Sequence, residues 1–308
     1  MLDLNALRTL LNRHGQALEY PVRGFDIAGR VFDFNRRRAL MGVVNLSPDS
    51  WYHESVCRTE GEAVARGLAL AREGADLVDV GAESTLPNAA RVAPQEQSDR
   101  LVPIVRALAA QGVIVSVESY HPQVLEACGQ AGARVFNLTG LKDGQEVFKL
   151  ARRFEAALVL CYVQGQTVRQ VGDFEFAPDM TAELEAYFQQ HLARAEALGV
   201  RRCIVDPGLG FYYRNLEDGN LRVNYQMHTF LNSFRLARLG YPVMNILPHA
   251  PEIFGPEQRR AAEPFFAVLA LLGGTHVVRT HELPVVARIR AVMELFRAER
   301  GEGPGRLP

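Results

Sequence analysis

Residues 72–81 read REGADLVDVG and show the pattern on which the interpretation of the fold depends. A polar, helix-forming stretch ends in glycine, and a short β-branched run follows within a few residues. The same transition from helix to strand recurs along the chain, at Gly112, Gly132, Gly199, Gly240 and Gly274 in addition to Gly74. Each segment therefore predicts a helix that ends at glycine and a strand that begins soon afterwards.

Two further segments are predicted strands although no glycine precedes them, RALMGVVN at 38–45 and AALVLCYV at 156–163. They bring the number of predicted strands to eight, each followed by a helix-forming stretch. Alternating strands and helices build a parallel sheet through right-handed crossovers, and eight such units close most simply into a barrel. The predicted fold class is α/β, a (β/α)8 TIM barrel. A doubly wound open sheet is the alternative, but no GxGxxG follows the first strand to support a dinucleotide site.

The chain is expected to divide into three segments. Residues 1–37 should form an N-terminal helix and hairpin extension, because FDIAGRVFDF at 25–34 alternates around Ala28 and Gly29. This hairpin is expected to plug the N-terminal mouth of the barrel, with an irregular lead-in as the alternative. Residues 38–300 are expected to form the barrel, and residues 301–308, GEGPGRLP, a disordered tail.

The composition favours an enzyme or binding protein that acts on small molecules. The 308 residues carry 34 basic and 35 acidic side chains, so the overall charge indicates neither a nucleic acid nor an anionic membrane as partner. The four cysteines are widely spaced and no apolar run reaches spanning length, which predicts a cytoplasmic protein outside the membrane. Lysine occurs only at Lys142 and Lys149, so a Schiff-base mechanism of the phosphosugar aldolase kind has little support.

In a barrel of this kind, the residues just past the C-terminal ends of the strands converge on one pocket. These strand ends are polar, and in chain order they supply Asn45, Ser47, Asp49, Glu83, Ser84, Thr85, Glu118, Asn137, Gln164, Asp206, His249, Arg279 and His281. Carboxylates and amides come from strands three to six, and cationic donors from strand eight. We therefore expect a flat, nitrogen-rich heterocycle at the floor, with an anionic group near Arg279 and His281.

Some of these residues also have structural explanations. Asp206, in DPGLGF, would cap the next turn, with Gly208 and Gly210 at positive φ. Asn137 would satisfy backbone groups of its loop. Glu118 is harder to explain in this way, because a carboxylate that follows VIVSV points into the barrel mouth. At the level of sequence these alternatives stay open.

The same segments resemble, in order, the motifs of the dihydropteroate synthase family: MGVVNLSPDSW (41–51), GADLVDVGAESTLPNA (74–89), VSVESY (115–120), FNLTG (136–140), DPGLGF (206–211) and RTH (279–281). The resemblance implies a (β/α)8 barrel that condenses 6-hydroxymethyl-dihydropterin diphosphate with an arylamine such as 4-aminobenzoate and releases pyrophosphate. It also implies Mg²⁺ as the cofactor and a homodimer. The implied partners are a pterin substrate and an amine acceptor.

The resemblance implies roles for the matching residues. Asn45 corresponds to a magnesium-linked asparagine; Thr85, Arg279 and His281 correspond to groups around the diphosphate; and Glu118, Asn137 and Asp206 would face the pterin. Gln164 and His249 join this substrate-binding set from their strand-end positions. The residues expected to carry the catalysis are Asp206, Arg279 and His281. Asp206 would stabilise the electron-poor pterin, while a metal and Arg279 would stabilise the leaving diphosphate.

The chain departs from the family pattern at several of these positions. Glu118 stands in place of an aspartate, Leu86 in place of an arginine, and Leu138 in place of a second aspartate. A Ser-Arg-Lys motif after strand seven is replaced by NILPHAPEIFG, in which His249 is the nearest substitute for the lysine. The departures imply that the residues expected to bind the pterin are largely retained, whereas those expected to bind the aminobenzoate are changed. Two other functions therefore stay open, a pterin-dependent methyltransferase acting with a separate corrinoid protein and a non-catalytic pterin-binding protein.

Overall fold

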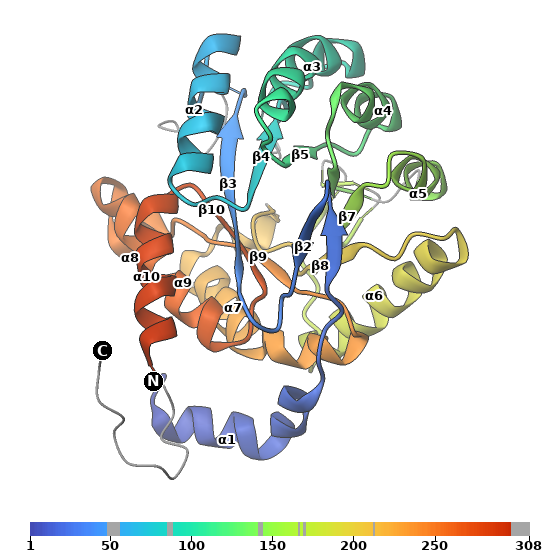
Figure 1. Ribbon diagram of the computed structural model, residues 1–308. Coiled ribbons are helices and arrows are strands. Elements are labelled where there is room, and N and C mark those ends of the chain that lie inside the picture. Colours follow the sequence, from blue (N-terminus) through green and yellow to red (C-terminus); the bar gives the residue numbers. More distant parts are fainter. Residues whose placement is uncertain are drawn as a thin grey trace.

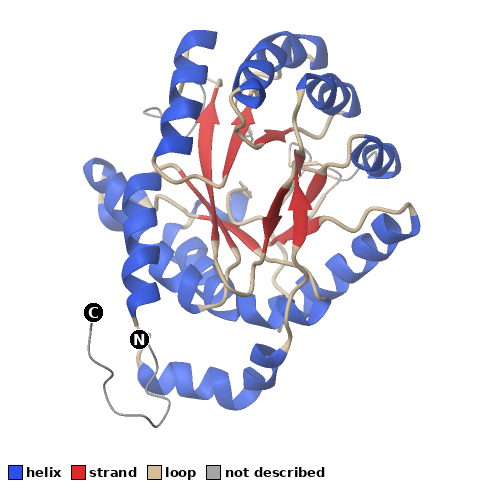
Figure 2. Cartoon of the chain, viewed as in Figure 1, coloured by secondary structure: helices blue, strands red, loops and turns tan. Residues whose placement is uncertain are grey.

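The computed structural model describes residues 1–47, 56–84, 89–140, 144–165, 167–168, 171–211 and 213–296. Within these ranges, strands at the centre are ringed by helices (Figures 1 and 2). Several residues singled out in the sequence, namely Asp49, Thr85, Leu86, Lys142 and the tail 301–308, lie outside the described residues.

The eight barrel strands pair in parallel, in the order β8-β7-β6-β5-β4-β3-β10-β9. They are β3 (Ala39–Asn45), β4 (Leu77–Gly81), β5 (Val115–Glu118), β6 (Val135–Leu138), β7 (Ala157–Cys161), β8 (Cys203–Asp206), β9 (Met244–Ile246) and β10 (Val277–Thr280). Between β8 and β9, a bridge joins Val205 to Val243, and the Val205 N–H donates to the Pro242 carbonyl at 2.9 Å. The barrel is thus nearly closed, which confirms the predicted fold and excludes the open sheet.

Helices follow the strands on the outside of the barrel. The longer ones are α2 (Glu60–Arg72), α3 (Pro94–Ala110), α4 (Pro122–Ala131), α5 (Gly144–Arg153), α6 (Met180–Ala197), α7 (Gly219–Asn232), α9 (Arg259–Leu272) and α10 (Leu283–Leu295). Short pieces are α8 (Pro251–Phe254), η3 (Arg214–Glu217), η4 (Ser233–Leu239) and η5 (Pro256–Gln258). All six glycines at the predicted helix-to-strand transitions have positive φ, from 74 to 118°. A left-handed residue there ends one element and redirects the chain into the next strand.

The N-terminal extension closes one end of the barrel. Helix α1 (Leu4–His14) and η1 (Gly15–Glu19) lead to β1 (Phe25–Ile27) and β2 (Arg30–Phe32), which pair as the expected antiparallel hairpin. Buried Ile27, Phe32 and Phe34 share an apolar cluster with residues at the starts of the barrel strands. The hairpin therefore covers the N-terminal mouth, so the barrel is open to a ligand from its other end.

A buried carboxylate ties this extension to the barrel. Asp76 precedes β4 and accepts hydrogen bonds from the Arg37 guanidinium at 2.7 Å and the Leu40 N–H at 3.0 Å. Arg30 also donates to it, and Arg290 of α10 lies 3.5 Å away. A carboxylate that is 4% exposed is costly to bury unless it is paired in this way. Asp76 therefore holds the hairpin, β3 and α10 together.

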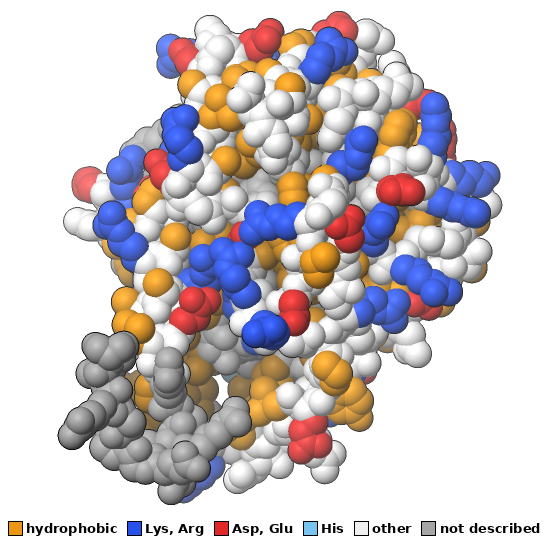
Figure 3. Space-filling view, viewed as in Figure 1, with side chains coloured by type: hydrophobic (Ala, Val, Ile, Leu, Met, Phe, Trp, Pro, Cys, Tyr) orange, Lys and Arg blue, Asp and Glu red, His pale blue; other side chains and the backbone are white. Residues whose placement is uncertain are grey.

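On the face shown in Figure 3, basic and acidic side chains are interspersed, as the near balance of 34 to 35 suggests. In the part of the chain that the structure describes, no helix combines the length and the apolar character needed to cross a bilayer.

Candidate active site

A polar pocket opens at the C-terminal ends of the barrel strands. Ten of the thirteen strand-end residues line it, namely Asn45, Ser47, Glu83, Ser84, Glu118, Asn137, Asp206, His249, Arg279 and His281. They come from β3, β5, β6, β8 and β10 and from the loops after β3, β4, β9 and β10. The barrel geometry therefore brings together residues that are up to 236 positions apart in the sequence, as expected from their strand-end positions.

Arg279 is held at the floor of this pocket by two carboxylates. Its Nε donates to Asp79 Oδ2 at 2.8 Å, and its Nη2 donates to Glu118 Oε2 at 2.5 Å. Burial alone would lower the pKa of Arg279, but the attraction of Glu118 and Asp79 outweighs it and raises the pKa. The guanidinium is thus fixed in position and permanently charged.

Asp79 links Arg279 to the neighbouring strands. Its Oδ2 also accepts from Asn137 Nδ2 at 3.0 Å, and its Oδ1 accepts from the Ser116 hydroxyl at 2.5 Å. Asn137 in turn accepts the weak thiol hydrogen bond of Cys161 at 3.5 Å. This network fixes the orientation of the Asn137 amide and of Arg279 before any ligand binds.

Two carboxyl groups in the pocket have pKa values above the ordinary range. Burial raises the pKa of Asp206 to about 6, although the Gly208 N–H donates to its Oδ1 at 2.8 Å and works against the shift. Burial likewise raises the pKa of Glu118, against the opposing attraction of Arg279. The pocket therefore contains groups that can exchange protons near neutral pH.

The two glycines of DPGLGF have different roles, which corrects one expectation. Gly208 has φ of 76°, and a Cβ there would lie 2.2 Å from the Tyr162 carbonyl oxygen, so no other residue fits without rearrangement. Gly210 is not at positive φ, contrary to the prediction. Its constraint is packing, because a Cβ would lie 2.9 Å from the Ile246 side chain.

Gln164 lies in a different environment from the one predicted. Its amide Nε2 donates to the Glu175 carbonyl at 2.8 Å and the Tyr162 hydroxyl at 2.9 Å, and its Oε1 accepts from the Glu175 N–H at 2.6 Å. It is absent from the described residues that line the main pocket. Strand β7 ends at Cys161, so at Gln164 the chain has already left the barrel rim, and the side chain braces the following loop instead.

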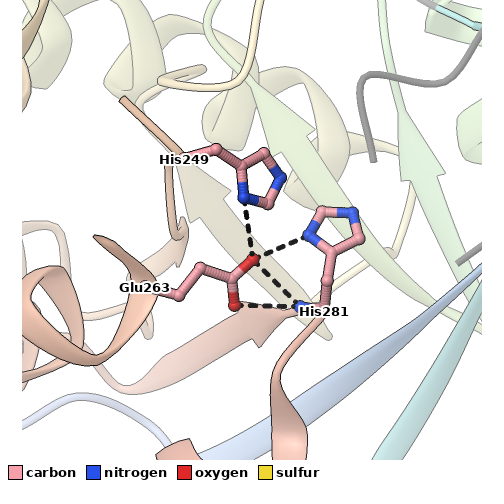
Figure 4. A group of neighbouring side chains, drawn as sticks. All are labelled: His249, Glu263 and His281. Carbon is pink, nitrogen blue, oxygen red and sulfur yellow. Dashed lines mark hydrogen bonds and ion pairs between the residues drawn. The ribbon is translucent and has the colours of Figure 1, made fainter. Parts of the chain in front are cut away.

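A second cluster lies at the corner of the pocket formed by the β9 and β10 loops. The Glu263 carboxylate, from α9, lies 2.8 Å from His281 Nδ1 and 3.6 Å from His249 Nδ1 (Figure 4). Burial alone would raise the pKa of Glu263, but its bond to His281 and the two imidazoles outweigh burial and lower the pKa. Glu263 is therefore an anion that orients the two histidines at the pocket wall.

Comparison with known proteins agrees with this site. A family model described as "Pterin binding enzyme" matches residues 41–281. The chain belongs to this family. Dihydropteroate synthase of Escherichia coli (strain K12) is 29% identical over 266 residues, 83% of this chain and 90% of that protein. The resemblance found in the motifs is thus confirmed.

Solved structures of pterin-binding enzymes share the fold. A dihydropteroate synthase from Xanthomonas albilineans, solved with 4-aminobenzoic acid, has a TM-score of 0.73 and 31% identity, covering 88% of this chain and 97% of that one. The same enzyme in complex with 7,8-dihydropteroate has a TM-score of 0.70 and 29% identity, covering 88% and 98%. The match extends over most of both chains and is therefore not confined to the barrel strands.

Asp79 and Glu263 support this site, but neither lies just past the end of a strand, so the strand-end pattern does not predict them. Asp79 lies inside a buried strand, and its signal is a carboxylate within the otherwise apolar LVDVG. Glu263 lies on a helix, where a single glutamate next to Pro264 gives no recognisable signal. Both act by holding Arg279 or the histidines in place.

Proposed function

We propose that the chain is a transferase of the dihydropteroate synthase type, which condenses 6-hydroxymethyl-dihydropterin diphosphate with an arylamine such as 4-aminobenzoate in folate-type pterin biosynthesis. The observation that carries the proposal is the pocket floor, where Arg279 is fixed by Asp79 and Glu118 beside Asn137 and Asp206. The family membership and the ligands named for the Xanthomonas albilineans structures support it.

The pterin ring would lie against the amide and carboxyl groups. A pterin presents ring nitrogens and an amino group on one edge, which match the donors and acceptors of Asn137, Glu118 and Asp206. Asp206 and Glu118 have raised pKa values, so each can be either an acceptor or a donor near neutral pH. This adaptability suits a ring whose charge increases when the diphosphate leaves.

In the proposed reaction, the bond from the exocyclic methylene to the diphosphate oxygen breaks, and a bond from the methylene to the arylamine nitrogen forms. The nitrogen loses one proton, and pyrophosphate leaves with the bonding electron pair. Arg279 and His281, on one side of the pocket, would stabilise the leaving anion, and Asp206 would stabilise the electron-poor ring. His249 would occupy the part of the pocket where the family has its lysine.

Mg²⁺ fits the donor set at the end of β3. Asn45 and Ser47 both line the pocket and offer an amide oxygen and a hydroxyl oxygen, the hard donors that Mg²⁺ prefers. Mg²⁺ usually binds through one or two protein groups together with substrate phosphates. Asn45 would hold the ion, which would supply positive charge to the leaving diphosphate.

We further propose a homodimer in the cytoplasm. Exposed apolar side chains gather on the neighbouring helices α9 and α10, namely Phe265, Val268, Leu272, Val285, Val292 and Leu295. A surface of this kind is typical of a subunit interface. All four cysteines are free and buried, in keeping with a reducing compartment.

The test is a direct assay of the full chain with the pterin diphosphate, 4-aminobenzoate and Mg²⁺, following pyrophosphate and dihydropteroate. We expect both products, and none from Asp206→Ala. Tight pterin binding without turnover of 4-aminobenzoate or other arylamines would instead indicate a binding protein. Methyl transfer from methyltetrahydrofolate to an added corrinoid protein would favour the methyltransferase.

A further inference from the structure

Three side chains from separate parts of the chain converge beside the pocket. They are His249 from the loop after β9, Glu263 from α9 and His281 from the loop after β10. Their potential ligand atoms all lie within 4.8 Å of one another. Figure 4 shows Nδ1 of both rings directed at the same carboxylate oxygen, Glu263 Oε1.

The two carboxylate oxygens of Glu263 contact different groups. Oε2 accepts from the Thr280 hydroxyl and from the Glu282 N–H at 3.1 Å, and so fixes the carboxylate to the loop after β10. Oε1 faces the imidazoles of His249 and His281. Because the side chain is fully buried, this oxygen is held in place toward the two rings.

The distances are compatible with an ion bound between the three side chains. The 3.6 Å from His249 Nδ1 to Glu263 Oε1 is too long for a hydrogen bond. Ligand atoms around a tetrahedral Zn²⁺, with bonds of about 2.0–2.1 Å, are separated by about 3.4 Å. The 2.8 Å from His281 Nδ1 to the same oxygen needs only a small opening to reach that value. The rings themselves lie 4.9 Å apart between centroids, so both can approach one ion.

The donor set also defines the metal. Two imidazoles and one carboxylate form the ligand set of many catalytic zinc sites, which keep one further position open. Mg²⁺, in contrast, prefers oxygen ligands, so this cluster and the Asn45 region would select different ions. Both histidines line the pocket, so the open position would face bound ligand.

Positive charge at this site would favour the binding of an anionic ligand in the pocket. Asp79, Glu118 and Asp206 are acidic groups around the buried guanidinium of Arg279. Arg222 also lines the pocket but is paired with Glu252, so additional positive charge would favour the entry of an anionic ligand. An ion held by His249 and His281 would lie at the wall of this pocket and attract an anionic oxygen, such as that of a phosphate or carboxylate.

We propose that His249, Glu263 and His281 form a three-ligand site for a divalent transition-metal ion such as Zn²⁺, with an open coordination position toward the pocket for water or an anionic oxygen of the ligand. His249 and His281 also line the proposed substrate pocket, but the three ligands converge without substrate, so metal binding can be tested apart from the condensation.

The test is calorimetric titration of the chelator-treated full chain with Zn²⁺, without pterin, together with the visible absorption of added Co²⁺. We expect one ion to bind per chain and Mg²⁺ not to compete with Zn²⁺ for the site. The visible absorption bands of bound Co²⁺ should be those of an ion with four or five ligands. His249→Ala and Glu263→Gln should each weaken Zn²⁺ at least about tenfold. Gln keeps an acceptor for Thr280, and His249 is only partly buried, so both variants should fold.

His228→Ala is the matched control, since His228 lies exposed on α7 outside the cluster. It should bind Zn²⁺ as the parent does. Absence of saturable one-to-one binding, or equal affinity in His249→Ala and the parent, would overturn the proposal. Because no substrate is present, a failed condensation assay leaves this result unaffected, and the two proposals are tested separately.

Discussion

Replacing Asp206 by asparagine should stabilise the fold at neutral pH while it abolishes activity. Burial raises the pKa of Asp206 from an ordinary 3.8 to about 6, so ionisation is disfavoured in the folded chain. A raised folded-state pKa means that the favourable contribution of the protonated acid is present below about pH 3.8 and is lost as the pH rises toward 6. Asparagine keeps the acceptor for the Gly208 N–H and never ionises.

The magnitude follows from the shift. About two pKa units correspond to about 3 kcal/mol at pH 7, whereas less than about 1 kcal/mol remains at pH 4. Urea unfolding of the parent and Asp206→Asn between these pH values measures the difference in the free energy of unfolding. We expect the stability gain of the variant to rise with pH and to level off above pH 7.

Asp99→Asn is the control, because Asp99 is exposed on α3. Its effect should remain within about 0.5 kcal/mol at every pH. Two results would refute a raised pKa of Asp206 in the folded chain. One is an Asp206→Asn variant less stable than the parent at pH 7, and the other is a difference in the free energy of unfolding that does not vary with pH.

Three further predictions concern the surroundings of the site. Arg279→Met should cost about 3–5 kcal/mol in the free energy of unfolding, because it leaves the buried Asp79 carboxylate without its cation; a loss below 1 kcal/mol would contradict the pairing. Gln164→Ala should leave pterin affinity unchanged in calorimetry and lower thermal stability modestly, since it removes only bonds within the loop; loss of affinity would return Gln164 to the pocket. Asp76→Ala should lower stability by at least about 3 kcal/mol and increase proteolysis of the N-terminal hairpin, which an unchanged digestion pattern would disprove.

The fold could be predicted from sequence because its signal is repeated. Gly74, Gly132 and Gly274 each mark a left-handed turn into a strand, and the repetition fixes both the element type and the number of units. The hairpin was recognisable from alternation around Ala28 and Gly29, both of which have positive φ.

The site was predictable only where it depends on strand ends. Glu118, Asn137 and Asp206 lie at or near the ends of their strands and so meet in the pocket. Gln164 shows the limit of this rule, because a residue a few positions beyond a strand can turn away from the rim. His249 also lies beyond its strand, but the Leu247 N–H donates to the Arg279 carbonyl at 3.0 Å and keeps that loop along the rim.

Side chains that support the site through tertiary contacts had no local signal. Glu263 reaches the pocket corner only because α9 packs against the loop after β10, and no spacing within the sequence relates it to His249 or His281. Asp79 was visible as an acidic residue in an apolar strand, but its role required knowledge that Arg279 lies opposite.

The most direct test of the central claim is calorimetric titration of the full chain with 6-hydroxymethyl-dihydropterin diphosphate and Mg²⁺, repeated on Asp206→Ala. We predict one site with micromolar affinity in the parent and no measurable binding in the variant. Absence of binding to the parent, or equal binding by both, would contradict the assignment of this pocket as a pterin site.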